Sequence, residues 1–319
     1  MNTGINTQKN RGEVLVKILK RYGIGIVLLL LVIVSGIIEP AFLSMRNITN
    51  VLRQVSINGI IAIGMTFVII SDGIDLSVGS VACLLGMLAI QMQAHMSFVF
   101  AILLVLLLGA AIGAINGYSI YRGMPPFIMT LATMTSVRGI AYLVSDGQNI
   151  TGTQEAYNFI GQGYLAGIPL PVIIFFALVL LAWFVLRKTR FGRGVYAMGG
   201  NAETARLSGI NIKYYRIAVY AISGLMVAVA AIVVTARLTS INPTLGDGYE
   251  LDAIAAVVIG GAAMTGGEGS ILRTVIGVLI IGCLSNVLNL LDVNTYLQQV
   301  VKGLIIFLAV ASDTWRKRK

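Results

Sequence analysis

Two carboxylates stand where an apolar run is interrupted, in the stretch SDGIDLSVGS from Ser71 to Ser80. Asp72 and Asp75 follow the run GIIAIGMTFVII, and a charge placed in lipid costs roughly 2.5–3.5 kcal/mol or more. Such a pair would suit an acid–base reaction, the coupling of transport to an ion, or the capping of a broken helix. The residues around the pair decide among these uses.

The chain lacks the partners that catalysis or metal binding would need. It contains no G-x-x-x-x-G-K-[ST], H-E-x-x-H or G-x-S-x-G, so nucleotide-binding and common hydrolase signatures are missing. Cys83 and Cys283 lie within apolar runs, and the lone His95 lies at a loop edge. We expect no catalytic residue, no metal site and no cofactor bound by this chain.

Asp75 has a natural structural use. It directly precedes Leu76 and Ser77 at the start of an apolar run, where a carboxylate can accept free N–H groups and favour the positive end of a helix. Ser77 could serve in the same way. Coupling carboxylates are expected within a span, whereas Asp72, Asp75 and Asp252 lie at the edges of apolar runs. We therefore expect Asp75 to cap a helix, and Asp72 has no assigned role.

The elements that hold these residues are membrane spans. Of the 319 residues, 57% are hydrophobic and only 11% are charged, about half the charge of a soluble domain. Apolar stretches occur at about 22–38, 54–71, 77–95, 97–117, 126–144, 168–186, 214–236, 251–265, 271–291 and 296–312. The pattern predicts an all-α polytopic membrane protein with about ten transmembrane helices. We expect a single transmembrane domain at 22–312 between cytoplasmic tails at 1–21 and 313–319.

The basic residues indicate an orientation. Sixteen of the 23 Lys and Arg residues lie in the first 21 residues, in Arg187–Arg216 and in the last four residues. Clusters flanking apolar runs are typical of cytoplasmic loops, and some of these residues are expected to contact anionic membrane lipid. The distribution argues against nucleic-acid binding. The loop Ser145–Gly167 has no Lys or Arg, so it is expected outside and both termini inside.

The two basic residues deepest in apolar runs, Arg138 and Lys302, are expected to be buried against other helices or to snorkel.

Two glycine-rich stretches interrupt apolar runs at corresponding places in the two halves. One ends at Gly79-Ser80, and the other runs from Gly260 to Ser270. Glycine-interrupted segments in matched positions are typical of a transport pathway, but ordinary cytoplasmic turns would look the same. Both interpretations stay open, as does re-entry into the bilayer. By contrast, the glycines spaced by four at Gly109, Gly113 and Gly117 indicate close helix packing.

The basic loop 187–216 contains GGNAETARLSGINIKYY, from Gly199 to Tyr215. Asn201 can cap a short helix over Ala202–Leu207 that ends at Gly209. Glu203 in the first turn and Arg206 in the last both favour the helix dipole. The segment would be either a plain linker or a docking element for a soluble partner.

Three motifs together resemble the membrane permease of ribose-type sugar ABC importers, the ribose, xylose, arabinose and galactose permease family. They are SDGIDLSVGS, GGNAETARLSGINI and YELDAIAAVVIGGAAMTGGEGS, in this order. The similarity extends from about Phe42 to Asp313. The resemblance implies an importer fold similar to the vitamin B12 and branched-chain amino-acid permeases. It also implies a bacterial inner-membrane location, a second permease subunit (a homodimer), cytoplasmic ATPase subunits that bind ATP and Mg, and a periplasmic or lipid-anchored sugar-binding protein.

The resemblance also assigns residues. Coupling to the ATPase would involve Asn201, Glu203, Arg206, Leu207 and Gly209. The translocation pathway would be shaped by Gly73, Ile74, Asp75, Leu76, Ser77, Gly260, Gly261, Gly266, Gly267 and Gly269. Transport would proceed by alternating access, with no enzymatic step in this chain.

Asp72 departs from the family pattern, where a small or neutral residue is expected, and the chain before about Ala41 shows no resemblance. The intact GIDLSVGS favours ribose-like relatives, so ribose or a related pentose is the expected sugar. The alternative is an ion-coupled secondary sugar carrier, in which Asp75 or Asp252 would be essential for coupling.

Overall fold

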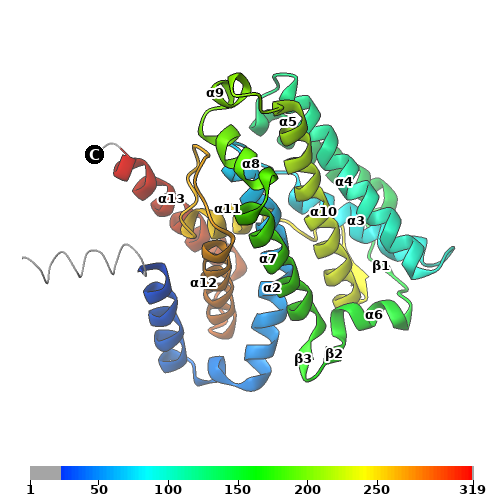
Figure 1. Ribbon diagram of the computed structural model, residues 1–319. Helices are drawn as coiled ribbons and strands as arrows, with labels where there is room; N and C mark the ends of the chain where they lie inside the picture. The colour runs from blue at the N-terminus through cyan, green and yellow to red at the C-terminus, as the bar shows by residue number, and fades with distance from the viewer. Residues whose placement is uncertain (1–22, 318–319) are drawn as a thin grey trace, which may run out of the picture.

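The computed structural model describes residues 23–317 and shows a helical protein (Figure 1). Its helices are Gly23–Ile38, the 3-10 helix η1 (Pro40–Leu43), α2 (Met45–Ile70), α3 (Val78–Met92), α4 (Phe98–Tyr121), α5 (Pro126–Ser145), α6 (Glu155–Gln162), α7 (Leu170–Lys188), α8 (Arg190–Gly200), α9 (Ala202–Leu207), α10 (Ile212–Leu238), α11 (Tyr249–Ile259), α12 (Ile271–Leu290) and α13 (Thr295–Lys317). The expected N-terminal tail, 1–21, and the last two residues of the expected C-terminal tail lie outside the described residues.

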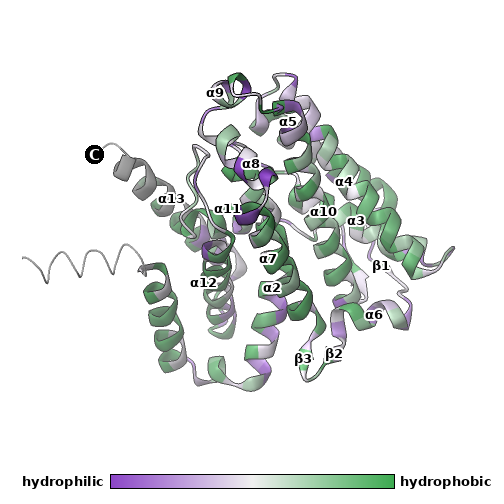
Figure 2. Cartoon of the chain, in the orientation of Figure 1, coloured by the Kyte–Doolittle hydropathy of each residue, from purple (hydrophilic) through white to green (hydrophobic). Residues whose placement is uncertain are grey.

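The expected all-α membrane fold is confirmed, but the number of spans is not. Each of the ten apolar stretches overlaps a helix, yet only six described helices are long and apolar enough to cross a membrane: α2, α4, α5, α7, α10 and α12. Gly23–Ile38 and α3 are apolar but shorter, and α11 has only 11 residues. A span needs about 20 residues. Figure 2 shows apolar residues along the long helices and hydrophilic residues at α8 and α9.

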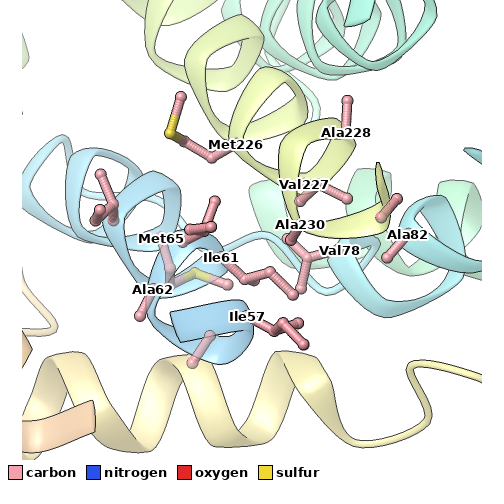
Figure 3. Packing of buried hydrophobic residues seen from close by; sticks show 14 of the residues in the cluster. Ile57, Ile61, Ala62, Met65, Val78, Ala82, Met226, Val227, Ala228 and Ala230 are labelled. Atoms are coloured by element: carbon pink, nitrogen blue, oxygen red, sulfur yellow. The ribbon is translucent and has the colours of Figure 1, made fainter. Parts of the chain in front are cut away.

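Helices α2 and α10 form the centre of the molecule. Helix α10 packs against α4, α2, α3 and α6, and most residues in the second half of α2 are buried. Figure 3 shows side chains of three helices meeting there: Ile57, Ile61, Ala62 and Met65 of α2, Val78 and Ala82 of α3, and Met226, Val227, Ala228 and Ala230 of α10. These aliphatic side chains exclude water and hold the elements that carry the polar residues described below.

The glycines spaced by four on α4 lie against the backbone of α10. A β-carbon on Gly109 would lie 2.5 Å from the carbonyl oxygen of Gly224, and one on Gly117 would lie 2.6 Å from that of Arg216. A β-carbon on Gly113 would lie even closer to the carbonyl of Tyr220. Real side chains do not approach so closely, so the expected close packing is confirmed, and this helix pair depends on glycine.

The two ends of the molecule differ. At one end, called here the α9 end, lie α8 and α9 (Figure 1). At the other, the α6 end, two short strand pairs accompany α6. Strand β1 (Ile150–Thr151) pairs antiparallel with β4 (Ser240–Ile241), and β2 (Tyr164–Leu165) pairs antiparallel with β3 (Ile168–Pro169). The loop expected on the outer side thus contains a helix and strands, and it is tied to the chain that follows α10.

Candidate functional site

The short helix expected after Asn201 is present with both ends as expected. Helix α9 covers Ala202–Leu207, and the Oδ1 atom of Asn201 accepts a hydrogen bond from the backbone N–H of Thr204 at 2.8 Å. Gly209 follows with φ of 83°, a backbone conformation that glycine adopts without a steric penalty. The local structure predicted from the sequence is therefore confirmed.

The surface of α9 combines an ion pair with an apolar side chain. Arg206 donates to Glu203 through Nε at 3.0 Å and through Nη2 at 2.6 Å. This guanidinium holds the pKa of Glu203 below its ordinary value. Both side chains are well exposed, so their attraction adds little to stability. Leu207 beside them is 75% exposed. Helix α9 therefore offers a mixed apolar and charged surface, and its role in coupling stays a prediction.

The two glycine-rich stretches meet each other against α8. The backbone N–H of Gly267 donates to the carbonyl of Ile70, the last residue of α2, at 2.8 Å. A β-carbon on Gly266 would lie 2.7 Å from the β-carbon of Asp72. Gly199 of α8 lies directly against the same carbonyl of Ile70. The end of α2, the end of α8 and the loop after α11 thus form one backbone junction, called here the glycine junction.

Side chains from α8 and α10 hold this junction. The Tyr196 hydroxyl donates to the carbonyl of Gly269 at 2.8 Å. Arg216 Nη1 donates to the carbonyls of Ser71 at 2.7 Å and Asp72 at 3.3 Å. Asp72 itself has φ of 60°, a left-handed conformation that Asp tolerates better than most residues. Asp72, unassigned in the sequence, forms the tight turn at the end of α2.

The remaining glycines of the second stretch turn the chain from α11 to α12. Gly260 follows the last turn of α11, and a β-carbon there would lie 2.9 Å from the backbone of Arg273. Gly261 has φ of 84°. Gly269 lies beside the side chain of Ile70, and a β-carbon on Gly269 would lie 2.6 Å from the Cγ1 atom of Ile70. These positions require glycine for close approach or for backbone conformation, and their part in a pathway stays a prediction.

Asp75 is buried, and both of its carboxylate oxygens accept hydrogen bonds. It is 2% exposed, and its Oδ1 accepts from the backbone N–H of Ser77 at 3.1 Å and from its hydroxyl at 2.6 Å. Its Oδ2 accepts from the hydroxyl of Ser223 on α10 at 2.9 Å. The expected acceptance of an N–H group near the start of α3 is confirmed. The expectation that Ser77 could cap is wrong, because its hydroxyl donates to Asp75 instead of accepting a backbone N–H.

A chain of hydrogen bonds extends from Asp75 across three helices. Asn116 of α4 donates to the Ser77 hydroxyl at 3.3 Å, and Thr133 of α5 donates to the Asn116 side-chain oxygen at 2.6 Å. We call Asp75, Ser77, Ser223, Asn116 and Thr133 the Asp75 network. Sequence reasoning missed Ser223, Asn116 and Thr133. Their only signal was a polar side chain inside an apolar run.

The other residues of the segment between α2 and α3 support this network. The hydroxyl of Tyr220 donates to the carbonyl of Ile74 at 3.1 Å, and a β-carbon on Gly73 would lie 2.6 Å from that hydroxyl. Leu76 packs against the hydrophobic core. The break is therefore a packed segment of the interior.

The depth of Asp75 could not be read from the sequence. Its partner Ser223 lies eleven residues after Ile212, where α10 begins, which is about 16 Å along a helix about 40 Å long. Asp75 lies between the end of α2 at Ile70 and the start of α3 at Val78, at a helix edge as expected. The chain between these two helices nevertheless lies inside the helical layer.

The two deep basic residues are paired. Lys302 of α13 contacts the Asp252 carboxylate of α11 at 2.9 Å and 3.0 Å. Arg138 of α5 contacts the Asp247 carboxylate at 2.6 Å, and its Nη1 donates to the carbonyls of Pro243 at 2.6 Å and Leu245 at 2.9 Å. The expected burial against other elements is confirmed for both.

Metal ligands do not gather in the described part of the chain. Within residues 23–317, no three His, Cys, Asp or Glu side chains are close enough to hold an ion. Cys83 and Cys283 are both buried, unpaired thiols.

Comparison with known proteins gives consistent matches over nearly the whole chain. A ribose import permease protein of Haemophilus influenzae is 46% identical over 91% of this chain and 92% of its own length. One of Bacillus subtilis is 48% identical over 93% of each chain. A xylose transport system permease protein of Haemophilus influenzae is 39% identical over 88% of this chain and 92% of its own length. No solved structure matches.

The family described as branched-chain amino acid transport system, permease component, matches residues 47–310. That range begins in the first turn of α2 and ends in α13, so it includes α8, α9, the glycine junction and the Asp75 network. These matches confirm the resemblance inferred from the three motifs. The chain belongs to this family of ABC importer permeases.

Proposed function

We propose that this chain is the membrane permease of an ATP-driven importer of a monosaccharide, with ribose or a related pentose as its substrate. The observation that carries the proposal is the similarity to two ribose import permease proteins at 46% and 48% identity over more than nine tenths of this chain. The xylose permease is less similar, at 39% identity. The six apolar helices support a protein that crosses the inner membrane several times.

We place the energy source on a separate chain. The sequence has no phosphate-binding loop, so ATP and Mg would be bound by a cytoplasmic ATPase subunit. The sugar would be delivered by a periplasmic or lipid-anchored binding protein. We expect two copies of this chain to form the membrane part, with a pathway that opens alternately to either side. Gly73 to Ser77 and the glycines from Gly260 to Gly269 would shape that pathway.

The α9 end would face the cytoplasm. Basic residues flank it on both sides, including Arg187, Lys188, Arg190 and Arg193 before α9, and such clusters are typical of the cytoplasmic side. Helix α9, with exposed Leu207 beside the Glu203–Arg206 pair, would then contact the ATPase. Its cap at Asn201 and its turn at Gly209 would hold it in a defined orientation.

Co-purification in mild detergent tests the assembly. The wild-type chain should bring down a P-loop ATPase in stoichiometric amount, and Leu207→Asp should weaken this association because it places a charge in the proposed contact. Leu165→Asp is a matched control, since Leu165 is 58% exposed at the α6 end. Equal loss of ATPase from both variants, or from neither, would contradict the coupling role of α9.

Transport in liposomes tests the function itself. Complexes with the ATPase and the binding protein should accumulate labelled ribose when ATP is supplied inside, and an ion gradient without ATP should drive no uptake. Asp75→Asn distinguishes the alternative. An ion-coupled carrier would lose gradient-driven uptake at normal expression, whereas the proposed importer should keep ATP-driven uptake in the folded fraction.

A further inference from the structure

A depression between α3, α5 and the start of α11 contains charged residues that the proposed coupling and pathway segments do not use. It has a volume of about 410 Å³ and is lined by Ser80, Met134, Thr135, Arg138, Asp247, Gly248 and Glu250. Small-molecule sites are of roughly 300–1,000 Å³ and combine apolar walls with a few polar groups. We call this depression the Arg138 site.

The Arg138 site lies at the middle depth of the helical layer. Arg138 follows Pro126, the start of α5, by twelve residues, about 18 Å along a helix about 30 Å long. Ser80, in the first turn of α3, is one of the lining residues of the site, and a β-carbon on Gly246 would meet the backbone of the preceding Gly79. The segment between β4 and α11 therefore runs from the α6 end into the interior, and α11 begins there.

Non-helical backbone at such depth is tolerated where it faces protein or a water-filled cavity. Ionisable side chains at such depth are rare, and they commonly mark the path of a solute. Three of them line this one depression. Arg138 has side-chain exposure of 18%, whereas Asp247 has 62%, so the arginine forms the wall and the aspartate stands at the opening.

The polar groups of the site are held in place by contacts within the fold. Arg138 Nη1 donates to the carbonyls of Pro243 and Leu245, its Nη2 lies 2.6 Å from the Asp247 carboxylate, and the guanidinium also contacts the Cys83 thiol. Glu250 Oε2 lies at the first turn of α3, 2.7 Å from where a β-carbon on Gly79 would be. Ser80 and Thr135 also line the depression, and the Thr135 hydroxyl donates to the carbonyls of Leu131 and Ala132 in its own helix.

We propose that the Arg138 site is a contact point for the sugar during its passage, with Glu250 and Arg138 binding neighbouring hydroxyl groups; this inference rests on the proposed function. Carboxylate oxygens accept from a hydroxyl and guanidinium N–H groups donate to one, so the pair matches adjacent hydroxyls. With two carboxylates against one guanidinium, the site favours an uncharged polyhydroxy compound over an anionic one.

Sugar preference is the property that this site controls. Ribose and xylose differ in configuration at a single carbon, so a side chain that binds the hydroxyl there discriminates between them. Glu250→Gln retains size and a carbonyl acceptor while removing the charge. In liposomes with ATPase and binding protein, it should lower import of at least one of the two pentoses by about tenfold and change the ribose-to-xylose ratio.

Glu155→Gln is the matched control, because Glu155 also lies in the first turn of a short helix, α6, away from the Arg138 site. It should leave both import rates and their ratio unchanged. Wild-type complexes that import neither pentose would refute the proposed function. Wild-type complexes that import ribose while Glu250→Gln keeps the wild-type rates and ratio would refute this inference alone.

A labelling measurement covers the case in which Glu250→Gln fails to assemble. Thr135→Cys introduces a thiol in the lining, whereas Cys83 and Cys283 are buried. In the assembled transporter this thiol should react with a small hydrophilic thiol reagent during ATP turnover, and ribose-loaded binding protein should slow the reaction. A thiol that does not react from either side of the membrane, or that reacts equally fast with sugar present, overturns the proposal.

Discussion

Removing the Ser223 hydroxyl should destabilise the protein more than removing any hydroxyl that serves only its own helix. Ser223→Ala leaves Oδ2 of Asp75 without the hydrogen bond of 2.9 Å that it now accepts. Ser223 is 0% exposed and Asp75 is 2% exposed, so water does not replace the lost donor. A buried charged acceptor left without its partner costs about 2–3 kcal/mol.

The matched control is Ser56→Ala. Ser56 is 1% exposed, and its hydroxyl donates at 2.6 Å to the carbonyl of Leu52 in the same helix. That carbonyl also accepts the N–H hydrogen bond of the helix, so loss of the Ser56 hydroxyl should cost less than about 1 kcal/mol. The two substitutions remove the same atom from equally buried positions, and only Ser223→Ala isolates a carboxylate.

The two buried thiols report unfolding directly. Cys83 and Cys283 are 0% and 6% exposed, so a thiol-reactive fluorophore should label them only as the protein unfolds on heating in detergent. By the scaling of domains of 150–250 residues, 2–3 kcal/mol corresponds to a fall in midpoint of roughly 4–12 °C. Ser56→Ala should move the midpoint far less.

A double substitution tests the cause. The Asp75→Asn substitution removes the charge. The new amide nitrogen can also donate to a neighbouring hydroxyl, which a carboxylate cannot do. Ser223→Ala should then cost at least about 1 kcal/mol less than in the wild-type background, which is the coupling expected of residues in direct contact. Equal costs in both backgrounds, or equal midpoints for Ser223→Ala and Ser56→Ala, would show that the Ser223 hydroxyl does not stabilise a charged Asp75.

Three further outcomes follow from other contacts. Gly113→Ala should markedly lower the unfolding midpoint, since its β-carbon would meet the carbonyl of Tyr220, whereas Gly139→Ala, with open space around it, should not. Lys302→Met should lower the midpoint by an amount corresponding to about 2–3 kcal/mol, because it isolates the half-buried Asp252 carboxylate. Because the Glu203 pKa lies below its ordinary value, the stabilising effect of its ion pair should be present above the ordinary carboxylate pKa and be lost as the pH falls below it; the midpoint difference between wild type and Glu203→Gln at several pH values checks this sign.

The sequence predicted best those features that depend on neighbours in the chain. The cap at Asn201, the six residues of α9 and the turn at Gly209 all depend on residues within one or two helical turns, and all are confirmed. The close packing of Gly109 and its two companions also follows from spacing alone, although the partner helix does not. Local chemistry leaves few alternatives in such cases.

Features that join distant segments were not predictable in the same way. Ser223 contacts Asp75 across 148 positions, and nothing in its apolar surroundings distinguishes it from other serines in helices. The meeting of Gly199 with Ile70 likewise needs the tertiary arrangement of α2 and α8. The depth of Asp75 was not predictable for a related reason, because hydropathy marks where an apolar run is interrupted but not how deep the interruption lies.

The segment between α2 and α3 and the loop between α11 and α12 give the molecule a continuous set of rigid contacts. The glycine junction brings α8 into backbone contact with the end of α2, where no side chain can absorb a displacement. Five residues later the same chain reaches Asp75, whose hydrogen bonds hold α10 and, through Ser77 and Asn116, α4. Helix α9 follows α8 directly. Helix α9 is therefore connected to the centre of the fold through backbone contacts and buried hydrogen bonds. These two kinds of contact resist gradual deformation. A buried carboxylate is costly in a membrane protein, and these contacts give a physical reason for Asp75 close to the glycine junction.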